Sequence, residues 1–590
     1  MITSFSIAIQ VILISLVLFF AIFTGYEFFS SNENRKNKKK SKSSINHSSV
    51  FVANDYSNSN ADTYNNRETD TSHAICSILL PVCNEVPVVE QLISAVYRIE
   101  VPKHCEVEIL ILDDSSDDNA DVIKKIVDNF INKIQGQQFE YPVHKEIFYH
   151  HRPICERNGF KAGNISYGLK FSKGDFIVIF DADCIPPQNF LKDTIPYFKN
   201  EKVGFLQTAI EFYNRTENFI TRFLALETSH KDDITSKQSN SQSNNYCSEN
   251  LNVQNDYQDF ASLTGSSCIW RKSCLDEIGG FSSATLTEDI DLCYRAQLHG
   301  WQYIYAENVI STEELPNRIS GLRIQRHRWA YGLIRNAFMY TSKVLRVSDF
   351  SFCKKFKVFM LISQTFLLAS FVVLLFLSLP LVFVTDELGT TFNITCTVFL
   401  LTTILWGYNN LSTGKNRIDR KSGVNNLTTS FDDHEKEKRE TNDSNIRASE
   451  SIVSVHKFEG NIKQAAPISF FEYVGYILLY LPLSLYYFTA LIENIFGLKV
   501  SFTPTEKKGF SNKKSSIQVP FKNKTSLANK SKNNFYLFGL EIFCFVYALV
   551  VNILSIYLKN WWTLLYGAIC FLGFGIVIWL SILEHSDNKK

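Results

Sequence analysis

The segment Phe176-Ile-Val-Ile-Phe-Asp181-Ala-Asp183 places five apolar residues directly before two carboxylates. A short, continuous apolar run of this kind indicates a strand that is buried on both faces of a sheet. Similar runs at Ser77–Pro81, Val107–Leu112 and Gly204–Gln207 alternate with helical patterns within Ile75–Phe350. Strands that alternate with helices predict an α/β domain with a largely parallel sheet.

Acidic side chains follow two of these runs. Asp113 and Asp114 come after one, and Asp181 and Asp183 come after the other. Ligands of doubly wound sheets bind beyond the carboxyl ends of the strands, and residues i and i+2 of an extended chain point the same way. Asp181 and Asp183 are therefore candidates to hold Mg²⁺ or Mn²⁺ together with diphosphate oxygens. The alternative is that these acids only end strands in turns.

Three further polar patterns follow in the same region. Arg157–Asn164 places two cations in a glycine-rich stretch, which is a candidate phosphate contact. Thr287–Asp291 supplies acids near the start of a predicted helix, Ile290–Leu298, and Gln325–Trp329 combines polar, cationic and aromatic side chains. Taken singly, these patterns also fit a solvated loop, acids that interact with a helix dipole and a basic patch beside a membrane. The occurrence of all three patterns in one region indicates a functional site.

The amino-acid composition excludes several classes of protein. Sixty basic residues against 59 acidic ones leave a net charge of +1, so no overall field favours nucleic acid. The 45% of hydrophobic residues gather in long blocks, which excludes a soluble single-domain protein. Thirteen cysteines without a C-x-x-C pair argue against a disulfide framework or a zinc ribbon and favour a reducing compartment. Cys184, beside the acids, is expected to pack rather than to bind metal.

Five apolar segments match the roughly 20 helical residues that a bilayer core of ~30 Å requires. They are Phe5–Thr24, Val358–Val384, Thr391–Tyr408, Phe535–Leu558 and Trp561–Leu583. A sixth segment, Ile468–Phe496, contains two glutamates, a proline and many tyrosines, and we expect it to lie along the interface. Basic loops stay cytoplasmic. With five spans, the basic stretches Arg35–Lys42 and Lys499–Lys532 share that side.

The chain is thereby divided into seven segments. They are a membrane anchor (1–28), a disordered basic linker (30–72), a cytoplasmic α/β domain (75–350, with a low-complexity insert at 234–256), a transmembrane hairpin (358–409), a disordered loop (410–467), an interface helix with a following loop (468–534) and a second transmembrane hairpin (535–585). The three polar segments are rich in Asn, Ser and Lys and poor in the apolar residues that a packed core needs, so disorder is expected there.

These motifs together resemble the membrane-embedded family 2 glycosyltransferases of the cellulose synthase superfamily. The pattern D, D-x-D, T-E-D and Q-x-x-R-W of that family is present as Asp114, Asp181-Ala-Asp183, Thr287-Glu288-Asp289 and Gln325–Trp329. The likeness is closest to plant cellulose synthase-like mannan and glucomannan synthases, through Arg157–Asn164, Thr264–Arg271 and Glu314–Trp329. Phe502-Thr-Pro-Thr505-Glu-Lys507 resembles the F-x-V-T-x-K gating loop of bacterial cellulose synthase.

The resemblance implies a GT-A-type, Rossmann-like cytoplasmic domain joined to a multi-pass helical membrane region. The implied reaction is inverting and processive transfer of a hexose from a nucleotide sugar to a β-linked glucan or mannan. It makes Asp289, beside Glu288, the general base, places the metal at Asp183 with help from Asp181, and lets Trp329 stack on the acceptor. The implied donor contacts are Glu85, Asp114, Lys161, Asp181, Gln325 and Arg328, and the implied gating residues are Phe502, Thr505 and Lys507.

The implied partners are UDP-glucose or GDP-mannose, a polysaccharide acceptor and the lipid bilayer of the Golgi or the plasma membrane. Five helices are few for a closed channel, which leaves a homo-oligomer open. Cys83 replaces an aromatic residue in the first-strand motif, and Pro504 replaces the valine of the gating loop. The insert at 234–256 lies where the acceptor site should begin, so acceptor specificity does not carry over from the family.

Other functions stay open at this point. A non-processive transferase that glycosylates a lipid, as ceramide glucosyltransferases do, carries similar motifs. A membrane scaffold that only binds nucleotide sugars would have no need of a base at Asp289. Trp329 would also serve as an interfacial anchor, and Asp289 as a residue that interacts with the dipole of the following helix.

Overall fold

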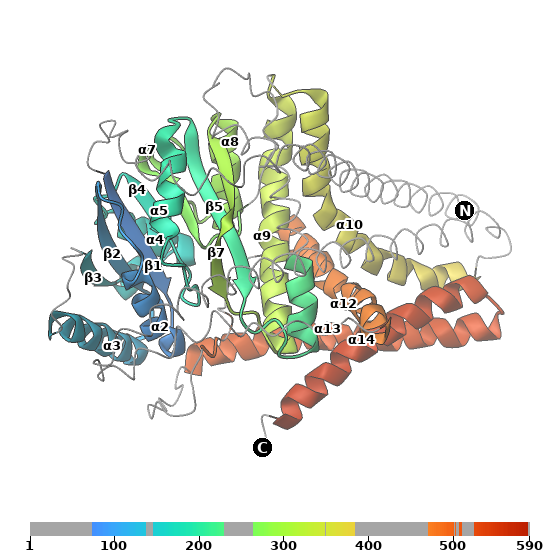
Figure 1. The fold of residues 1–590 in the computed structure, drawn as a ribbon. Helices are drawn as coiled ribbons and strands as arrows, with labels where there is room; N and C mark the ends of the chain where they lie inside the picture. The colour runs from blue at the N-terminus through green and yellow to red at the C-terminus, as the bar shows by residue number, and fades with distance from the viewer. Residues whose placement is uncertain are drawn as a thin grey trace, which may run out of the picture.

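The computed structural model describes residues 74–136, 145–228, 263–348, 350–383, 470–498, 500, 502, 505, 507–509 and 524–587. The segments expected at 1–28, 30–72, 234–256 and 410–467 lie outside these residues, as does the predicted span Thr391–Tyr408. The described chain forms a sheet with helices on both faces, and a group of long helices stands beside it (Figure 1).

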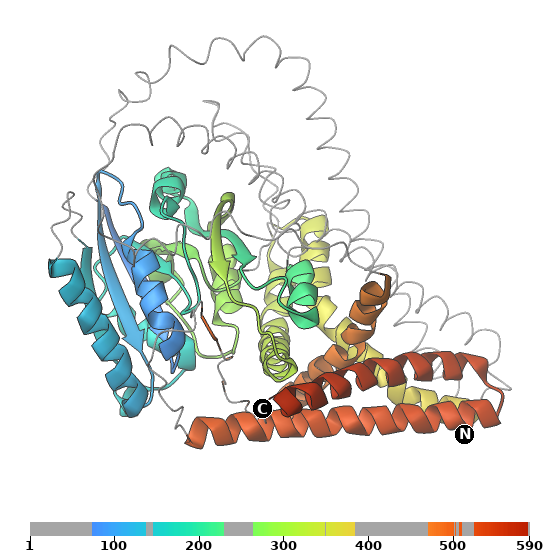
Figure 2. The same cartoon turned by 60° about the horizontal axis from the view of Figure 1, so that its bottom comes forward.

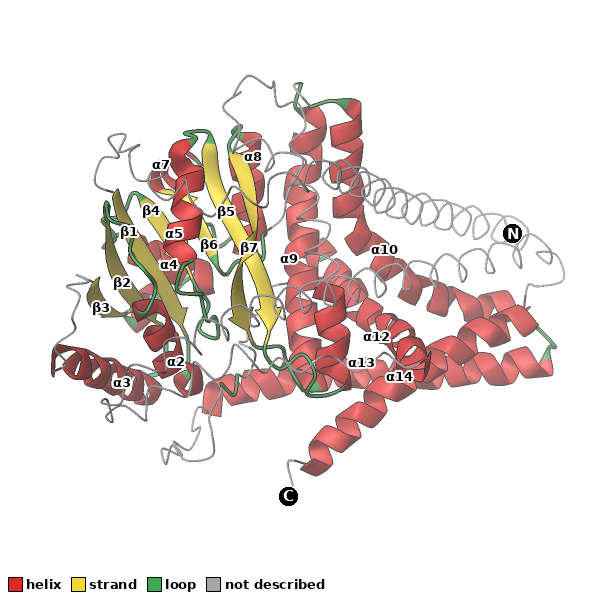
Figure 3. Cartoon of the chain, viewed as in Figure 1, coloured by secondary structure: helices red, strands yellow, loops and turns green. Residues whose placement is uncertain are grey.

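A seven-stranded sheet in the order β3-β2-β1-β4-β6-β5-β7 forms the centre of the α/β part (Figure 3). Its strands are β1 (Ala74–Val82), β2 (Cys105–Asp113), β3 (Lys145–His151), β4 (Phe176–Ile179), β5 (Val203–Phe212), β6 (Cys268–Arg271) and β7 (Gln302–Glu313). Neighbouring strands are parallel except at β6, which pairs antiparallel with β4 and β5. The four strands predicted from apolar runs are all present, and the expected α/β class is confirmed.

Both faces of the sheet are apolar because successive side chains of a strand point to opposite sides. In β1, for example, Ile78 and Leu80 belong to one buried cluster and Leu79 to the other. The first cluster lies under α2 (Val86–Tyr97), α3 (Asp117–Gly136), α5 (Phe190–Thr194) and the 3-10 turn η2 (Ile195–Lys199). The second lies under α4 (Phe160–Leu169), α7 (Lys272–Glu277) and α8 (Glu288–Leu298). The carboxyl ends of β1, β2 and β4 share one edge with the starts of α2, α3, α4 and α8, whereas α7 begins at the opposite edge, after the antiparallel strand β6.

Within the described residues, five long helices form the second part of the structure. They are α9 (Ile319–Arg346), α10 (Phe352–Phe383), α12 (Phe470–Ile495), α13 (Lys524–Tyr557) and α14 (Trp561–Asp587). Helix α9 stands between the sheet and helices α10 and α12, and α13 and α14 lie side by side (Figures 1 and 2). One apolar cluster joins all five helices to residues 219–228.

Three helices of the described chain are long and apolar enough to cross a membrane: Phe470–Ile495, Asn534–Tyr557 and Trp561–Ser586. The last two correspond to the expected C-terminal hairpin. The first corresponds to the expected interface helix, and 67% of its most apolar window is buried in the protein, against 28% in the other two. Composition alone thus permits α12 to span, and its placement along the interface stays a prediction. Helix α10 covers most of the predicted span Val358–Val384, with a shorter apolar stretch at Leu368–Pro380.

A buried polar network fastens α9 to three of these helices. The guanidinium of Arg323 donates from Nε to Glu541 Oε1 of α13 over 2.7 Å, and from Nη2 to Glu541 Oε2 over 2.8 Å. It also donates to Ser581 Oγ of α14 over 2.9 Å, while the Tyr486 hydroxyl of α12 donates to Glu541. A charge pair removed from water is retained only when hydrogen bonds satisfy it fully. The network therefore fixes how α9 meets the apolar helices.

Candidate active site at the carboxyl edge of the sheet

Acids from separate segments meet around the ammonium of Lys161, in the first turn of α4. Its Nζ lies 2.5 Å from Asp181 Oδ1, after β4, and 3.7 Å from Glu288 Oε1, at the start of α8. It also donates a hydrogen bond of 2.9 Å to the carbonyl of Gly265, before β6. Although burial opposes it, the two carboxylates raise the pKa of Lys161. Residues that are far apart in the sequence thus share one charged cluster.

The second carboxylate of the D-x-D motif faces a different lysine. Asp183 is buried, and its Oδ2 accepts from the backbone N–H of Glu314 over 3.0 Å and from Lys507 Nζ over 2.5 Å. Lys507 also donates to the Glu314 carbonyl over 3.0 Å, and the Glu314 carboxylate accepts the N–H groups of Lys508 and Gly509. The segment predicted as a gating loop therefore reaches the edge of the sheet and is fastened there by Glu314.

This edge is strongly acidic. Burial raises the pKa of Glu85 to about 8, and the neighbouring Asp183 adds to the shift. Burial and Asp183 likewise raise the pKa of Glu313, at the end of β7, to about 8. Two lysines compensate the negative charges of the aspartates at this edge, since Lys507 pairs with Asp183 and Lys161 with Asp181. A cation that binds at this edge would favour the ionised form of Glu85 and Glu313 and would lower their pKa values.

The carboxylates suit a divalent ion that is completed by substrate. Within the described residues, no group of three or more His, Cys, Asp or Glu side chains forms a ready-made cage. Mg²⁺ binds through one or two carboxylates plus phosphate oxygens, so a pair such as Asp181 and Asp183 fits this mode of binding. Cys184 is fully buried in the apolar cluster beneath α2, as expected for a packing residue.

Asp289, the expected base, stands beside the first cluster on α8. Burial and the adjacent Glu288 raise its pKa to about 7, although Lys161 opposes the shift. Gly265 approaches Asp289 so closely that an added Cβ would lie 2.9 Å from Asp289 Oδ2, and its φ of +79° suits glycine. The site therefore holds a carboxyl group whose pKa is close to neutral pH, as a general base requires.

Helix α9 supplies the cationic and aromatic side of the site. The Arg328 guanidinium faces four acids, Glu288, Asp181, Asp289 and Glu85, while burial lowers its pKa. It also lies 4.6 Å from the ring centroid of Phe502.

The other expected residues of α9 and the gating loop lie around Arg328. Gln325 is half-buried one turn earlier on the same helix. The ring of Trp329 is also half-buried and lies 5.1 Å from the guanidinium of Arg326, a buried residue that is paired with Glu227. Thr505 lies against the first turn of α9, near Gly321.

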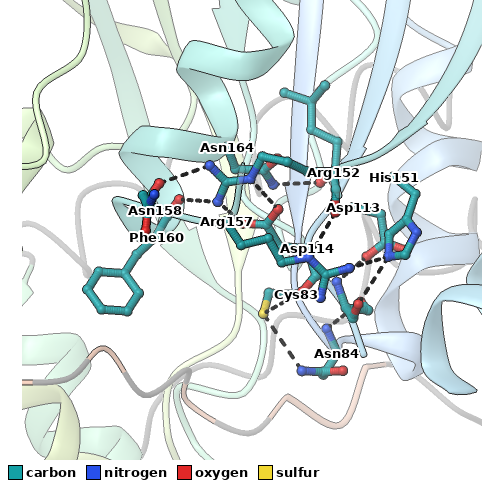
Figure 4. Close-up of polar contacts among 12 residues, drawn as sticks. Cys83, Asn84, Asp113, Asp114, His151, Arg152, Arg157, Asn158, Phe160 and Asn164 are labelled. Carbon is teal, nitrogen blue, oxygen red and sulfur yellow. Dashed lines mark hydrogen bonds and ion pairs between the residues drawn. The ribbon is translucent and has the colours of Figure 1, made fainter. Parts of the chain in front are cut away.

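Asp114 lies at the other end of the edge, after β2. Its carboxylate accepts hydrogen bonds from Arg152, and Arg157 donates from Nε to the Arg152 carbonyl over 2.9 Å (Figure 4). Arg157 thus turns toward this end, whereas Lys161 of the same glycine-rich stretch turns toward Asp181. Asp113 is buried and accepts from Tyr149 and from the N–H of Ser115, so it has a structural role.

Sequence reasoning missed several residues of this site. Arg152 gave a weak signal, because an Arg-Pro pair after a strand is common in loops. Glu313 ends β7 and Glu314 follows it; this strand was not predicted, so the position of both residues at the carboxyl edge was not foreseen. Glu227 gave no signal, since its pairing with Arg326 joins residues 99 positions apart.

Comparison with known proteins agrees with this geometry. Residues 176–409 match the glycosyl transferase family group 2. This region is a family 2 glycosyltransferase domain. It includes the D-x-D carboxylates, the T-E-D motif and the Q-x-x-R-W motif of α9. Glucomannan 4-beta-mannosyltransferase 7 of Arabidopsis thaliana is 30% identical over 289 residues, which are 48% of this chain and 47% of that protein. The chain thus spans about half the length of this curated relative.

Solved structures show more distant likenesses. The mannosyltransferase PcManGT from Pyrobaculum calidifontis, in complex with GDP-Man and Mn²⁺, matches 82% of this chain and all of its own, with 12% identity and a TM-score of 0.40. The S. aureus protein TarS, residues 1–349 in complex with UDP, matches 46% of this chain and 66% of its own, with 14% identity and a TM-score of 0.29.

Proposed function

We propose that the chain is an inverting, processive hexosyltransferase that extends a β-linked glucan or mannan with sugar from UDP-glucose or GDP-mannose. The observation that carries the proposal is the cluster in which Asp181, Glu288 and Lys161 meet beside Asp289. The family 2 match and the name of the Arabidopsis relative support it, and that name makes GDP-mannose the first donor to test.

The described residues supply the parts that such a reaction needs. Asp289 takes the proton of the acceptor hydroxyl, because its raised pKa lets the ionised form act as a base near pH 7. The leaving nucleoside diphosphate gains negative charge, and the cations of Lys161 and Arg328 lie at the edge where it would form. Asp183 and Asp181 would hold Mg²⁺ or Mn²⁺, which would supply Lewis-acid stabilisation of that diphosphate.

Residues at both ends of the carboxyl edge would recognise the donor and the acceptor. Glu85 and Asp114 are positioned to contact the nucleoside, and Gln325 to hydrogen-bond the diphosphate. Trp329 is expected to stack on a sugar ring of the acceptor. Phe502, Thr505 and Lys507 close over the donor as a gating segment, which is supported by their contacts with Arg328, Gly321 and Asp183.

The membrane helices suit a product that must leave through the bilayer. Unpaired hydroxyl groups cost several kcal/mol each in hydrocarbon, so a polysaccharide requires a lined path. Helix α9 carries Trp329 and is fastened to α12, α13 and α14 through Arg323. We infer a multi-pass protein of the Golgi or plasma membrane that has its sheet on the cytoplasmic side, where the basic loops belong. The seven-segment division given by the sequence is part of this proposal.

The test uses membranes that contain the full chain. Labelled GDP-mannose and UDP-glucose are supplied separately with Mn²⁺ or Mg²⁺, and any product is sized and digested with linkage-specific glycanases. Asp289→Asn serves as the inactive control. A long β-linked polymer from one donor supports the proposal, whereas a single hexose on a lipid would replace processive synthesis with lipid glycosylation. Donor binding without any transfer would indicate a scaffold.

A further inference from the structure

A buried arginine connects the two ends of the site. Arg152 follows β3 and is 2% exposed. Its Nε donates to Asp114 Oδ1 over 2.8 Å and its Nη2 to Asp114 Oδ2 over 2.5 Å, as Figure 4 shows. Two parallel charge-assisted hydrogen bonds are strong and directional. The carboxylate of Asp114 is therefore held in one orientation.

The same guanidinium also contacts the turn that leads into α4. Its Nη1 donates to the carbonyl of Asn158 over 2.9 Å, and its Nη2 to the carbonyl of Phe160 over 3.3 Å. Gly159 has a φ of +81° and Phe160 a φ of +51°. A bulky residue with positive φ is strained and persists only where its surroundings hold it. Arg152 binds the carbonyls on both sides of Gly159, so it holds this turn.

This turn also sets the positions of the Phe160 ring and the Lys161 ammonium at the diphosphate end of the site. Phe160 directly precedes Lys161, which pairs with Asp181. The ring of Phe160 stacks on Phe502 of the gating segment with a centroid distance of 5.5 Å, and Phe502 lies under Arg328. A shift of the turn would therefore move both the lysine and the aromatic contact of the gating segment.

We propose that Arg152 is a positioning residue that couples the nucleoside end of the donor site, at Asp114, to the diphosphate end, at Lys161. The inference rests on the proposed function. A nucleoside bound at Asp114 stabilises the paired hydrogen bonds between Arg152 and that carboxylate. The fixed guanidinium then holds the turn at Gly159 and orients Lys161 toward the diphosphate of the donor. Lysine cannot replace the arginine, because one ammonium lacks the planar set of donors that spans a carboxylate and two carbonyls.

The first experiment measures nucleotide binding by the full chain in nanodiscs. UDP and GDP are titrated by calorimetry into the wild type, Arg152→Lys and the control Arg271→Lys. Arg271 is a matched arginine, since its guanidinium donates to the carbonyls of Val203, Phe198 and Asn200, away from the site. We expect Arg152→Lys to bind the preferred nucleotide about tenfold more weakly, as the loss of a charged hydrogen-bond pair predicts, and to raise the donor KM equally.

Equal nucleotide affinity of Arg152→Lys and the wild type would overturn the inference and leave the proposed function standing. A wild type that binds neither nucleotide would instead refute the proposed function. The Arg271→Lys control should retain wild-type affinity, and an equal loss in both variants would show a general effect on the fold that also overturns the inference.

The second experiment needs no variant. Hydrogen–deuterium exchange of the wild-type chain is followed with UMP and GMP, which lack the β-phosphate. We expect the preferred monophosphate to protect the backbone of Asn158–Lys161, because binding at Asp114 acts on this turn through Arg152. If the monophosphate binds and exchange of this segment is unchanged, Arg152 does not couple the two ends, whether or not Arg152→Lys folds.

Discussion

The pKa of Asp289 makes the pH dependence of sugar transfer predictable. Burial and the adjacent Glu288 raise this pKa to about 7, and only the ionised carboxylate accepts a proton. The ionised fraction is roughly 9% at pH 6 and roughly 91% at pH 8, so kcat/KM should rise about tenfold over this range. The sign follows from the role: a base with a raised pKa loses activity as the pH falls.

Substitutions at this position separate the base from other titrating groups. Asp289→Asn should lower kcat/KM by about 10² to 10⁴ and remove the rise around pH 7. Glu288→Gln should move the midpoint to lower pH, because Glu288 raises the pKa of Asp289. Asp276→Asn, an exposed carboxylate paired with Lys272 on α7, should leave the profile unchanged.

The assay is the initial rate of labelled hexose incorporation from pH 5.5 to 8.5, at fixed Mn²⁺ and donor below KM. A wild-type midpoint near 4 would show that the carboxylate is not perturbed. An Asp289→Asn variant that retains the wild-type rate and profile would refute the assignment of this residue as the base.

Three further results are expected. Lys507→Met should tighten Mn²⁺ binding by nucleotide-free protein, because it removes the ammonium that pairs with Asp183; equal or weaker affinity in a paramagnetic resonance titration would contradict this. Gly265→Ala should slow transfer about tenfold, since the added Cβ crowds Asp289 at a positive φ, and an unchanged rate would argue against this close contact. Arg323→Met should destabilise the chain by about 3–5 kcal/mol, because its carboxylate partner stays buried without a counterion. Denaturant midpoints measure this loss, and removal of both charges should restore most of it.

Much of the fold was visible in the sequence because its signals are local. The run Phe176–Phe180 is apolar throughout, as a strand covered on both faces must be, and it forms β4 as predicted. The helix expected at Ile290–Leu298 is α8, which begins at Glu288. The acids after β4 and at the start of α8 were also predicted to act together, and they meet at Lys161.

The sequence by itself determined four of the seven strands, the apolar C-terminal helices and the acids that follow β2 and β4 at the carboxyl edge. Only the tertiary structure decided the pairs: Lys507 with Asp183, 324 positions apart, and Arg323 with Glu541, 218 positions apart. The physical reason is that apolar runs and periodicities are properties of neighbouring residues. An ion pair between distant segments depends on how the sheet and helices pack, so residue types alone do not specify it.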